Sequence, residues 1–298
     1  MKQIKKAMLL SIVVFLNCPE IYALGSKRPA LPKQPPTPTS PSNPSPPAPN
    51  TTYTEQIKSI ASNSTCANYS WKNRGKAPSG YIKGMALNYA RSYCRLKSAE
   101  GASVNHVSII SAKAGAAAKD ALAHYSSTFL SAGLTVNTDG VDSLRAIWTL
   151  GVGLGMRESS GKYCEGRDMS ASNTSASSAE AGMFQTSYNS IAANPELEVL
   201  YREYKRGEKS CFLEVYKLGV TCRDTSNAGS GEGLVYQKLN KSCPAFAAEY
   251  AMLMLRVRRN HYGPINRKEV EVKPVCSSML KSIEIMIDND SNACQDIL

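Results

Sequence analysis

Eight cysteines constrain the fold of this 298-residue chain more than any other feature of its sequence. They are Cys66, Cys94, Cys164, Cys211, Cys222, Cys243, Cys276 and Cys294. An even number of cysteines in an exported chain predicts paired thiols, here four disulfides, although the pairing stays open among roughly a hundred connectivities. No metal is expected, because the chain has no C-x-x-C and its three histidines lie far from any paired thiol spacing.

The N-terminus has the pattern of a secretory signal. Three lysines precede the short apolar run "AMLLSIVVFL", and small residues follow in "YALG". We expect residues 1–23 to be a signal peptide cleaved after Ala23, and the mature protein to be secreted or periplasmic in a bacterium. The apolar run is shorter than the ~20 residues of a spanning helix and no later run is longer, so no transmembrane segment is expected. Lipidation of Cys18 is an alternative, but "FLNC" matches a lipobox poorly.

Residues 24–52 are expected to form a proline-rich linker. Ten of the sixteen prolines fall within residues 29–49, where proline, serine and threonine cannot build a core. Such a segment favours an extended polyproline spacer, and a proline-rich ligand for a partner domain is the alternative. Residues 53–298 are long enough for a single elaborated domain.

The net charge of the chain indicates which kinds of partner it could bind. The formal charge is +11, and removing residues 1–23 takes away three lysines and one glutamate and leaves +9. A basic exported protein suits an anionic polymer such as cell-wall material. No nucleic-acid partner is expected, because no nucleic-acid motif is present. The densest basic cluster, "RVRRNH", is explained by the preference of cations for helix C-termini.

Apolar periodicity predicts a mostly α-helical fold. Apolar residues recur at steps of three and four, with proline or acidic starts and glycine stops, and strand signals are sparse. The expected helices cover residues 80–98, 115–133, 139–161, 195–207, 243–259 and 275–287. Two β-prone patches, "ASVNHVSII" and "VEVKPV", remain ambiguous between strand and helix.

The helix expected at residues 139–161 places a carboxyl where it is costly. One face carries Leu144, Ile147, Leu154 and then Glu158, and three glycines in this helix indicate that another segment packs very closely against it. Desolvation and the negative end of the helix dipole both raise the pKa of Glu158, which suits a general acid. The alternative is an ordinary glutamate at a helix end, paired with a neighbouring lysine or arginine.

A second segment favours the general acid over the ordinary helix-end glutamate. The pair "ESSG" at 158–161 and "AGMFQ" at 181–185 resembles the lysozyme-like superfamily of lytic transglycosylases and goose-type lysozymes. The resemblance implies a lysozyme-like domain with additional N-terminal helices, its motif core at about 140–270. It also implies that Glu158 is the catalytic acid and that Ser159, Met183 and Gln185 line a saccharide groove.

The sequence departs from the family pattern in ways that affect mechanism. "ESSG" is one residue shorter than E-S-x-x-G, and Thr186 and Ser187 stand where goose-type lysozymes have an aspartate. The A-Y-N motif is absent, and Tyr262 is the candidate for its tyrosine.

Inverting hydrolysis needs a second carboxylate ~6.5–9.5 Å from the acid. We expect Asp168 in that role, with Glu165 and Glu180 as further candidates and groove residues. A lytic transglycosylase needs one carboxyl only.

The resemblance therefore implies an exported muramidase that cleaves the β-1,4 bond between N-acetylmuramic acid and N-acetylglucosamine in peptidoglycan. It is expected to act as a monomer without a cofactor. The acids near Glu158 raise the further hypothesis that deacetylated glycan is tolerated. The alternatives are a lytic transglycosylase that forms anhydro ends, and a non-catalytic wall-binding protein of the same shape.

Overall fold

The computed structural model describes residues 52–98, 105–169 and 174–298. The expected signal peptide and all but the last residue of the expected linker lie outside these ranges. The described residues are mostly helical, which confirms the predicted class. None of their helices is both long and apolar enough to cross a bilayer.

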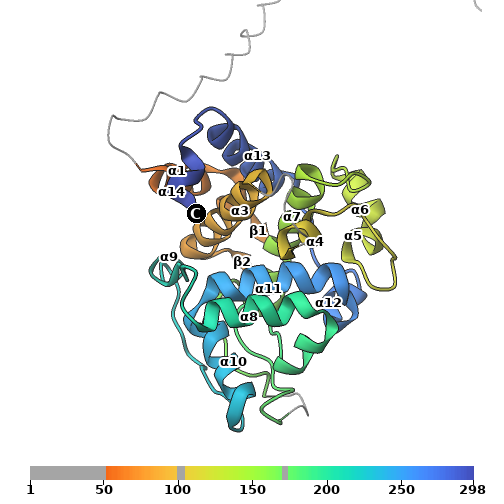
Figure 1. The fold of residues 1–298 in the computed structure, drawn as a ribbon, viewed down its shortest axis with the longest axis vertical. Coiled ribbons are helices and arrows are strands. Elements are labelled where there is room, and N and C mark those ends of the chain that lie inside the picture. Colours follow the sequence, from red (N-terminus) through yellow and green to blue (C-terminus); the bar gives the residue numbers. More distant parts are fainter. Residues whose placement is uncertain (1–51, 99–104, 170–173) are drawn as a thin grey trace, which may run out of the picture. The chain divides into compact units, whose positions relative to one another are not determined.

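Figure 1 shows the helices that make up this domain. The α-helices are α1 (Tyr53–Asn63), α2 (Thr65–Asn68), α3 (Ser79–Ser98), α4 (His106–Ser111), α5 (Ala121–His124), α6 (Ser126–Ser131), α7 (Val141–Ser159), α8 (Pro195–Lys205), α9 (Leu213–Tyr216), α10 (Gly231–Ser242), α11 (Pro244–Val257), α12 (Gly263–Asn266), α13 (Pro274–Asp288) and α14 (Ala293–Ile297). Two 3₁₀ helices, η1 (Tyr188–Ala193) and η2 (Arg259–His261), and one antiparallel hairpin of β1 (Ser70–Trp71) and β2 (Gly75–Lys76) complete the described elements.

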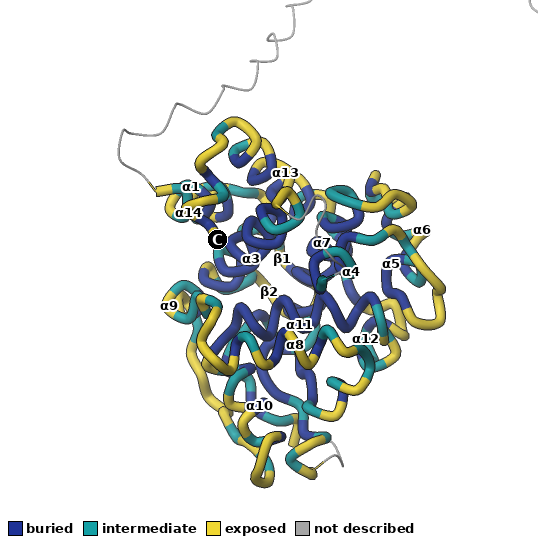
Figure 2. The backbone as a smooth tube through the Cα atoms, in the orientation of Figure 1, coloured by how far each residue is buried: buried dark blue, intermediate teal, exposed yellow. Residues whose placement is uncertain are grey.

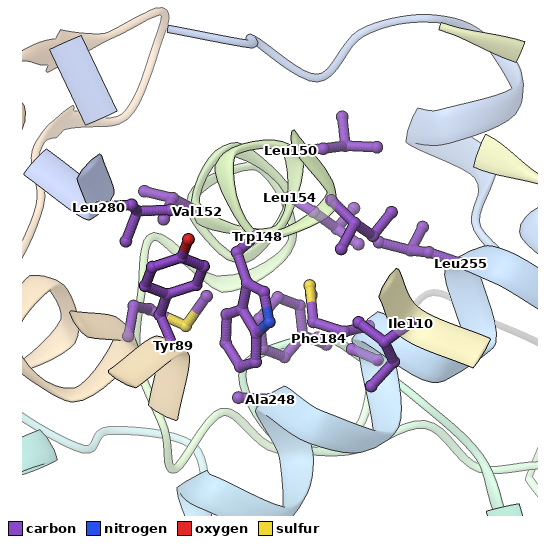
Figure 3. Packing of buried hydrophobic residues seen from close by; sticks show 14 of the residues in the cluster. Tyr89, Ile110, Trp148, Leu150, Val152, Leu154, Phe184, Ala248, Leu255 and Leu280 are labelled. Carbon is purple, nitrogen blue, oxygen red and sulfur yellow. The ribbon is translucent and has the colours of Figure 1, made fainter. Parts of the chain in front are cut away.

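Helix α7 lies at the centre of the core. It contacts α3, α4, α11 and α13, and its residues are buried on almost every side rather than along one stripe (Figure 2). Figure 3 shows Val152 facing Leu280 of α13, while Trp148 points toward Tyr89 and Phe184. A helix that is apolar all round is the expected occupant of such a position.

The glycines of α7 permit close packing, as the sequence predicted. A Cβ at Gly153 would lie 2.1 Å from the carbonyl oxygen of Glu271, and one at Gly155 would lie 2.3 Å from the hydroxyl of Tyr81. A Cβ at Gly151 would meet the end of the Met252 side chain. These contacts bring α3 and the 270–273 segment against the helix that ends in Glu158.

The helix boundaries follow local signals. Helices α8, α11 and α13 each begin with a proline at the first helical position, where its missing N–H costs nothing. The Asn194 side chain also caps α8 by accepting from the backbone N–H of Glu196 at 2.9 Å.

The expected helix at 115–133 is not continuous. Asp120 caps α5 by accepting from the N–H of Leu122, so the alanines before it lie outside the helix, and α5 and α6 are separated at Tyr125. Asp120 is held there by an ion pair with buried Arg256, at 2.9 Å. Arg256, from the basic cluster "RVRRNH", therefore stabilises the interior rather than only a helix end.

The two ambiguous patches form no strand among their described residues. Asn105 accepts from two backbone N–H groups and starts α4, so the first patch ends as helix. Residues 270–273 run without regular structure against α7 before Pro274 starts α13.

All eight cysteines expected to pair do so. The disulfides are Cys66–Cys276, Cys94–Cys294, Cys164–Cys222 and Cys211–Cys243. The first two join residues about two hundred positions apart and fasten α13 and α14 to α2 and α3. The third joins the segment that follows α7 to the segment that precedes α10.

Candidate active site

Glu158 occupies the last turn of α7. The helix ends at Ser159 because Ser160 and Gly161 adopt left-handed backbone, with φ of 57° and 74°. Their N–H groups donate to the carbonyls of Met156 and Gly155, which satisfies the helix end. The chain turns away immediately after Glu158 and leaves its side chain at the edge of the core, partly buried.

The second motif forms a tight loop. Ala181 and Thr186 bridge its ends, and Gly182 and Gln185 both have positive φ. The Gln185 side-chain amide donates to the carbonyls of Gly166 and Gly182 at 3.1 and 2.8 Å. The glutamine therefore fixes the shape of this loop.

A single hydroxyl joins the two motifs. Ser159 Oγ donates to the carbonyl of Met183 at 3.0 Å and accepts from the N–H of Lys162 at 3.1 Å. Ser159 and Met183 are buried, and Gln185 is 9% exposed. These three residues were expected to line the groove, but their bonds and burial make them positioning residues that hold Glu180 and Glu158 on neighbouring segments.

The surroundings of Glu158 favour its neutral form. Burial raises the pKa of Glu158 to about 8, and the negative charge of Glu180 adds to the rise. The positive charges of Arg157, Arg74 and Arg267 act in the opposite direction. Desolvation outweighs the three arginines, so the carboxyl keeps its proton at neutral pH.

The other acids differ in how they relate to Glu158. Burial and the charge of Asp168 raise the pKa of Glu180. Asp168 is exposed, and its charge acts on Glu180. Glu165 lies 3.3 Å from Lys162 in an ion pair. Glu180, and not the expected Asp168, is therefore the acid most closely coupled to Glu158.

Tyr262 lies near both coupled carboxyls. Burial raises its pKa well above the ordinary value, and the charges of Glu158 and Glu180 contribute. The side chain is 2% exposed, and its hydroxyl has no hydrogen-bond partner among the described residues. A buried donor without a protein partner is a position where an internal water molecule would bind.

A cavity of about 440 Å³ lies along the last turns of α7, and Glu158 itself is not among the residues that line it. It is lined by hairpin residues 71–74, by Gly153, Met156 and Arg157 of α7, and by residues 268–271. Two of the arginines that act on Glu158, Arg74 and Arg157, line this cavity.

The hairpin wall of this cavity is fixed by one carboxylate. Glu271 accepts from the N–H of Lys72 at 2.7 Å and from the hydroxyl of Tyr69 at 2.9 Å. On the opposite wall, Glu269 bridges Arg157 and Arg267 at 2.7 Å each.

The sequence did not reveal the contribution of the hairpin. Arg74 lies about eighty positions before Glu158, in a stretch without periodicity or motif, and only the fold brings the two together. Trp71, whose buried indole N–H has no partner among the described residues, was missed for the same reason.

Comparisons with protein-family models, with curated proteins and with solved structures find no match for this chain.

Proposed function

We propose that the protein is a glycosidase of the lysozyme type that cleaves the β-1,4 bond between N-acetylmuramic acid and N-acetylglucosamine in peptidoglycan. One observation carries the proposal. The glutamate of "ESSG" lies partly buried at the end of α7, joined through Ser159 to the "AGMFQ" loop, with a pKa raised to about 8. A carboxyl that stays protonated at neutral pH can protonate a glycosidic oxygen as the bond breaks.

The chain supplies the parts that this reaction requires. Glu158 donates its proton to the leaving oxygen. The cavity beside the hairpin, which Arg74 and Arg157 help to line, would accommodate a sugar unit next to Arg157. In hydrolysis, Glu180 would act as the base that activates water.

Lytic transglycosylation is a second candidate, because the pKa of Glu180 is itself raised. A raised pKa leaves less of Glu180 ionised at a given pH, so less of it can act as a base toward water. With one effective carboxyl, the Glu158 carboxylate left by the first step would take a proton from the muramic acid hydroxyl that closes the anhydro ring. The same site serves both reactions, and the product ends distinguish them.

The structure gives little support to a preference for deacetylated glycan. That hypothesis required an acidic groove, but Arg74, Arg157 and Arg267 act on Glu158, and Glu165 is paired with Lys162. Ammonium groups on the sugar would meet these arginines. We therefore propose ordinary acetylated glycan as the substrate.

Mass spectrometry of material released from purified sacculi tests the proposal. Fragments with reducing muramic acid ends are expected for hydrolysis, and fragments with anhydro ends for transglycosylation. Sacculi that sediment with the protein yet release no fragments would instead establish a wall-binding protein. A protein that neither binds sacculi nor releases fragments from them would reject the proposal.

A further inference from the structure

A second cavity lies at the α7 terminus and includes the residue that caps the helix. It has a volume of about 370 Å³ and includes Ser160, two residues after Glu158, whereas the larger cavity includes Arg157, one residue before it. Three segments far apart in the sequence line the second cavity: residues 76–78, 160–162 and 219–223.

Each of these segments contributes one cation. Lys76, Lys162 and Arg223 line the cavity, and no lining residue is acidic. Lys162 pairs with Glu165, which lies outside the lining, while Lys76 and Arg223 form no ion pair within the described ranges. Positive charges gathered without a counter-ion repel one another, and an anion placed among them relieves that repulsion.

The walls of this cavity are held in place. The Cys164–Cys222 disulfide joins the segment of Lys162 to the segment of Arg223, each one or two positions from the bond. The N–H of Gly80 donates to the carbonyl of Leu218 at 2.8 Å, which fixes the start of the 219–223 segment against α3. A Cβ at Gly80 would lie 2.4 Å from the carbonyl of Val215, so this contact is close.

We propose that this cationic cavity binds a carboxylate of the stem peptide carried by muramic acid. The inference rests on the proposed function and specifies its substrate: a glycan strand that still bears its peptides. Lysine and arginine side chains form charge-assisted hydrogen bonds with carboxylates, and Lys76 and Arg223, which have no ion pair within the described ranges, can each donate to one. The position beside the end of α7 lets the peptide bind while the glycan lies at Glu158.

The test uses soluble glycan strands with uncross-linked stem peptides, and the same strands after an amidase has removed the peptides. Affinity is measured by fluorescence anisotropy in the Glu158→Gln protein, so binding is read without cleavage. Lys76→Gln combined with Arg223→Gln should weaken binding of peptide-bearing strands about tenfold or more. The same double variant should bind peptide-free strands with unchanged affinity. Lys238→Gln combined with Arg258→Gln, an equal loss of charge at exposed positions, is the control.

Three outcomes would overturn the inference. Equal weakening on both kinds of strand would mean that the cavity contacts the glycan itself, including the lactyl carboxylates that the amidase leaves, and no weakening would mean that it binds nothing on the strand. Weakening only on strands that carry phosphate polymers, absent after hydrofluoric acid treatment, would identify a phosphate as the ligand instead. If the parent binds strands selectively but never cleaves them, the proposed function fails while the inference about the peptide stands.

Discussion

At the residue scale, Glu158 combines two requirements that usually conflict. It must be shielded enough to keep its proton, yet reachable by a glycan. The end of α7 provides both, because the buried helix stops at Ser159 and leaves the Glu158 side chain only partly buried. The same pKa that supports catalysis has consequences that can be measured.

The pH dependence of activity is the first consequence. Since the pKa of Glu158 is about 8, the acid form is present at neutral pH and is lost as the pH rises through about 8. The rate constant kcat/KM on soluble glycan should fall on the alkaline side with a midpoint near that value. An alkaline midpoint near pH 5 would show that Glu158 has the pKa of an ordinary carboxyl.

Stability is the second consequence, and the sign follows from linkage. The folded-state pKa of Glu158 is raised above its ordinary value of 4.5, so the parent loses stability as the pH rises from about 4.5 to about 8. Glu158→Gln cannot lose a proton and escapes this loss. The Tm of the variant relative to the parent should therefore be higher at pH 8.5 than at pH 4.5. A Tm difference that does not change with pH would argue against a buried, protonated Glu158.

The sequence predicted the direction of this pKa shift, because both the helix end and the apolar face were visible in it. It did not predict that Glu180 is the coupled acid, nor that Arg74 and Arg267 oppose the shift. Those charges act across the fold from segments with no shared motif. Ser159 and Gln185 were placed near the site by resemblance, but only their hydrogen bonds showed that they position it.

At the element scale, α7 determines the site because every neighbouring segment is built around it. Its glycines let the 270–273 segment approach closely, and that segment carries Glu271, which fixes the hairpin. The three glycines of this helix predicted the close packing from the sequence. The start of α5 at Asp120 was not predicted, because Asp120 is held there by an ion pair with Arg256, which is far away in the chain.

Two glycines of α7 make a matched test of this packing. Alanine at Gly153 would place its Cβ 2.1 Å from a backbone oxygen of Glu271, so the 270–273 segment must move, at a cost of about 1–3 kcal/mol. Alanine at Gly151 meets only the flexible end of Met252 and gains helix propensity. Urea unfolding should show Gly153→Ala clearly less stable than Gly151→Ala. Equal stabilities would mean that the close approach at Gly153 is not present.

At the scale of the whole molecule, the disulfides connect the two ends of the described chain. The sequence predicted that eight cysteines pair, but their partners depend on where α13 and α14 return to α2 and α3. No local pattern encodes that return. A mostly helical, disulfide-linked fold was therefore predictable, while its connectivity was not.

The connectivity predicts a ranking of stabilities. Peptide mapping should recover the four disulfides, and a thiol assay on denatured, unreduced protein should find almost no free thiol at these eight positions. Opening Cys66–Cys276 and Cys94–Cys294 together by serine substitution should cost clearly more than opening Cys211–Cys243 in the chain-entropy account, because the two bonds close loops of 210 and 200 residues and the third a loop of 32. The reverse order would contradict that account, and different mapped pairs would contradict the fold.

The most direct test of the central claim is the rate at which Glu158→Gln releases fragments from sacculi. Glutamine has nearly the same volume but cannot donate the proton, so the rate should fall by about 10²–10⁴-fold while folding is retained. Glu165→Gln, which removes a neighbouring carboxyl that is paired with Lys162, serves as the control and should keep most of the activity. A folded Glu158→Gln protein that cleaves as fast as the parent would contradict the assignment of Glu158 as the catalytic acid.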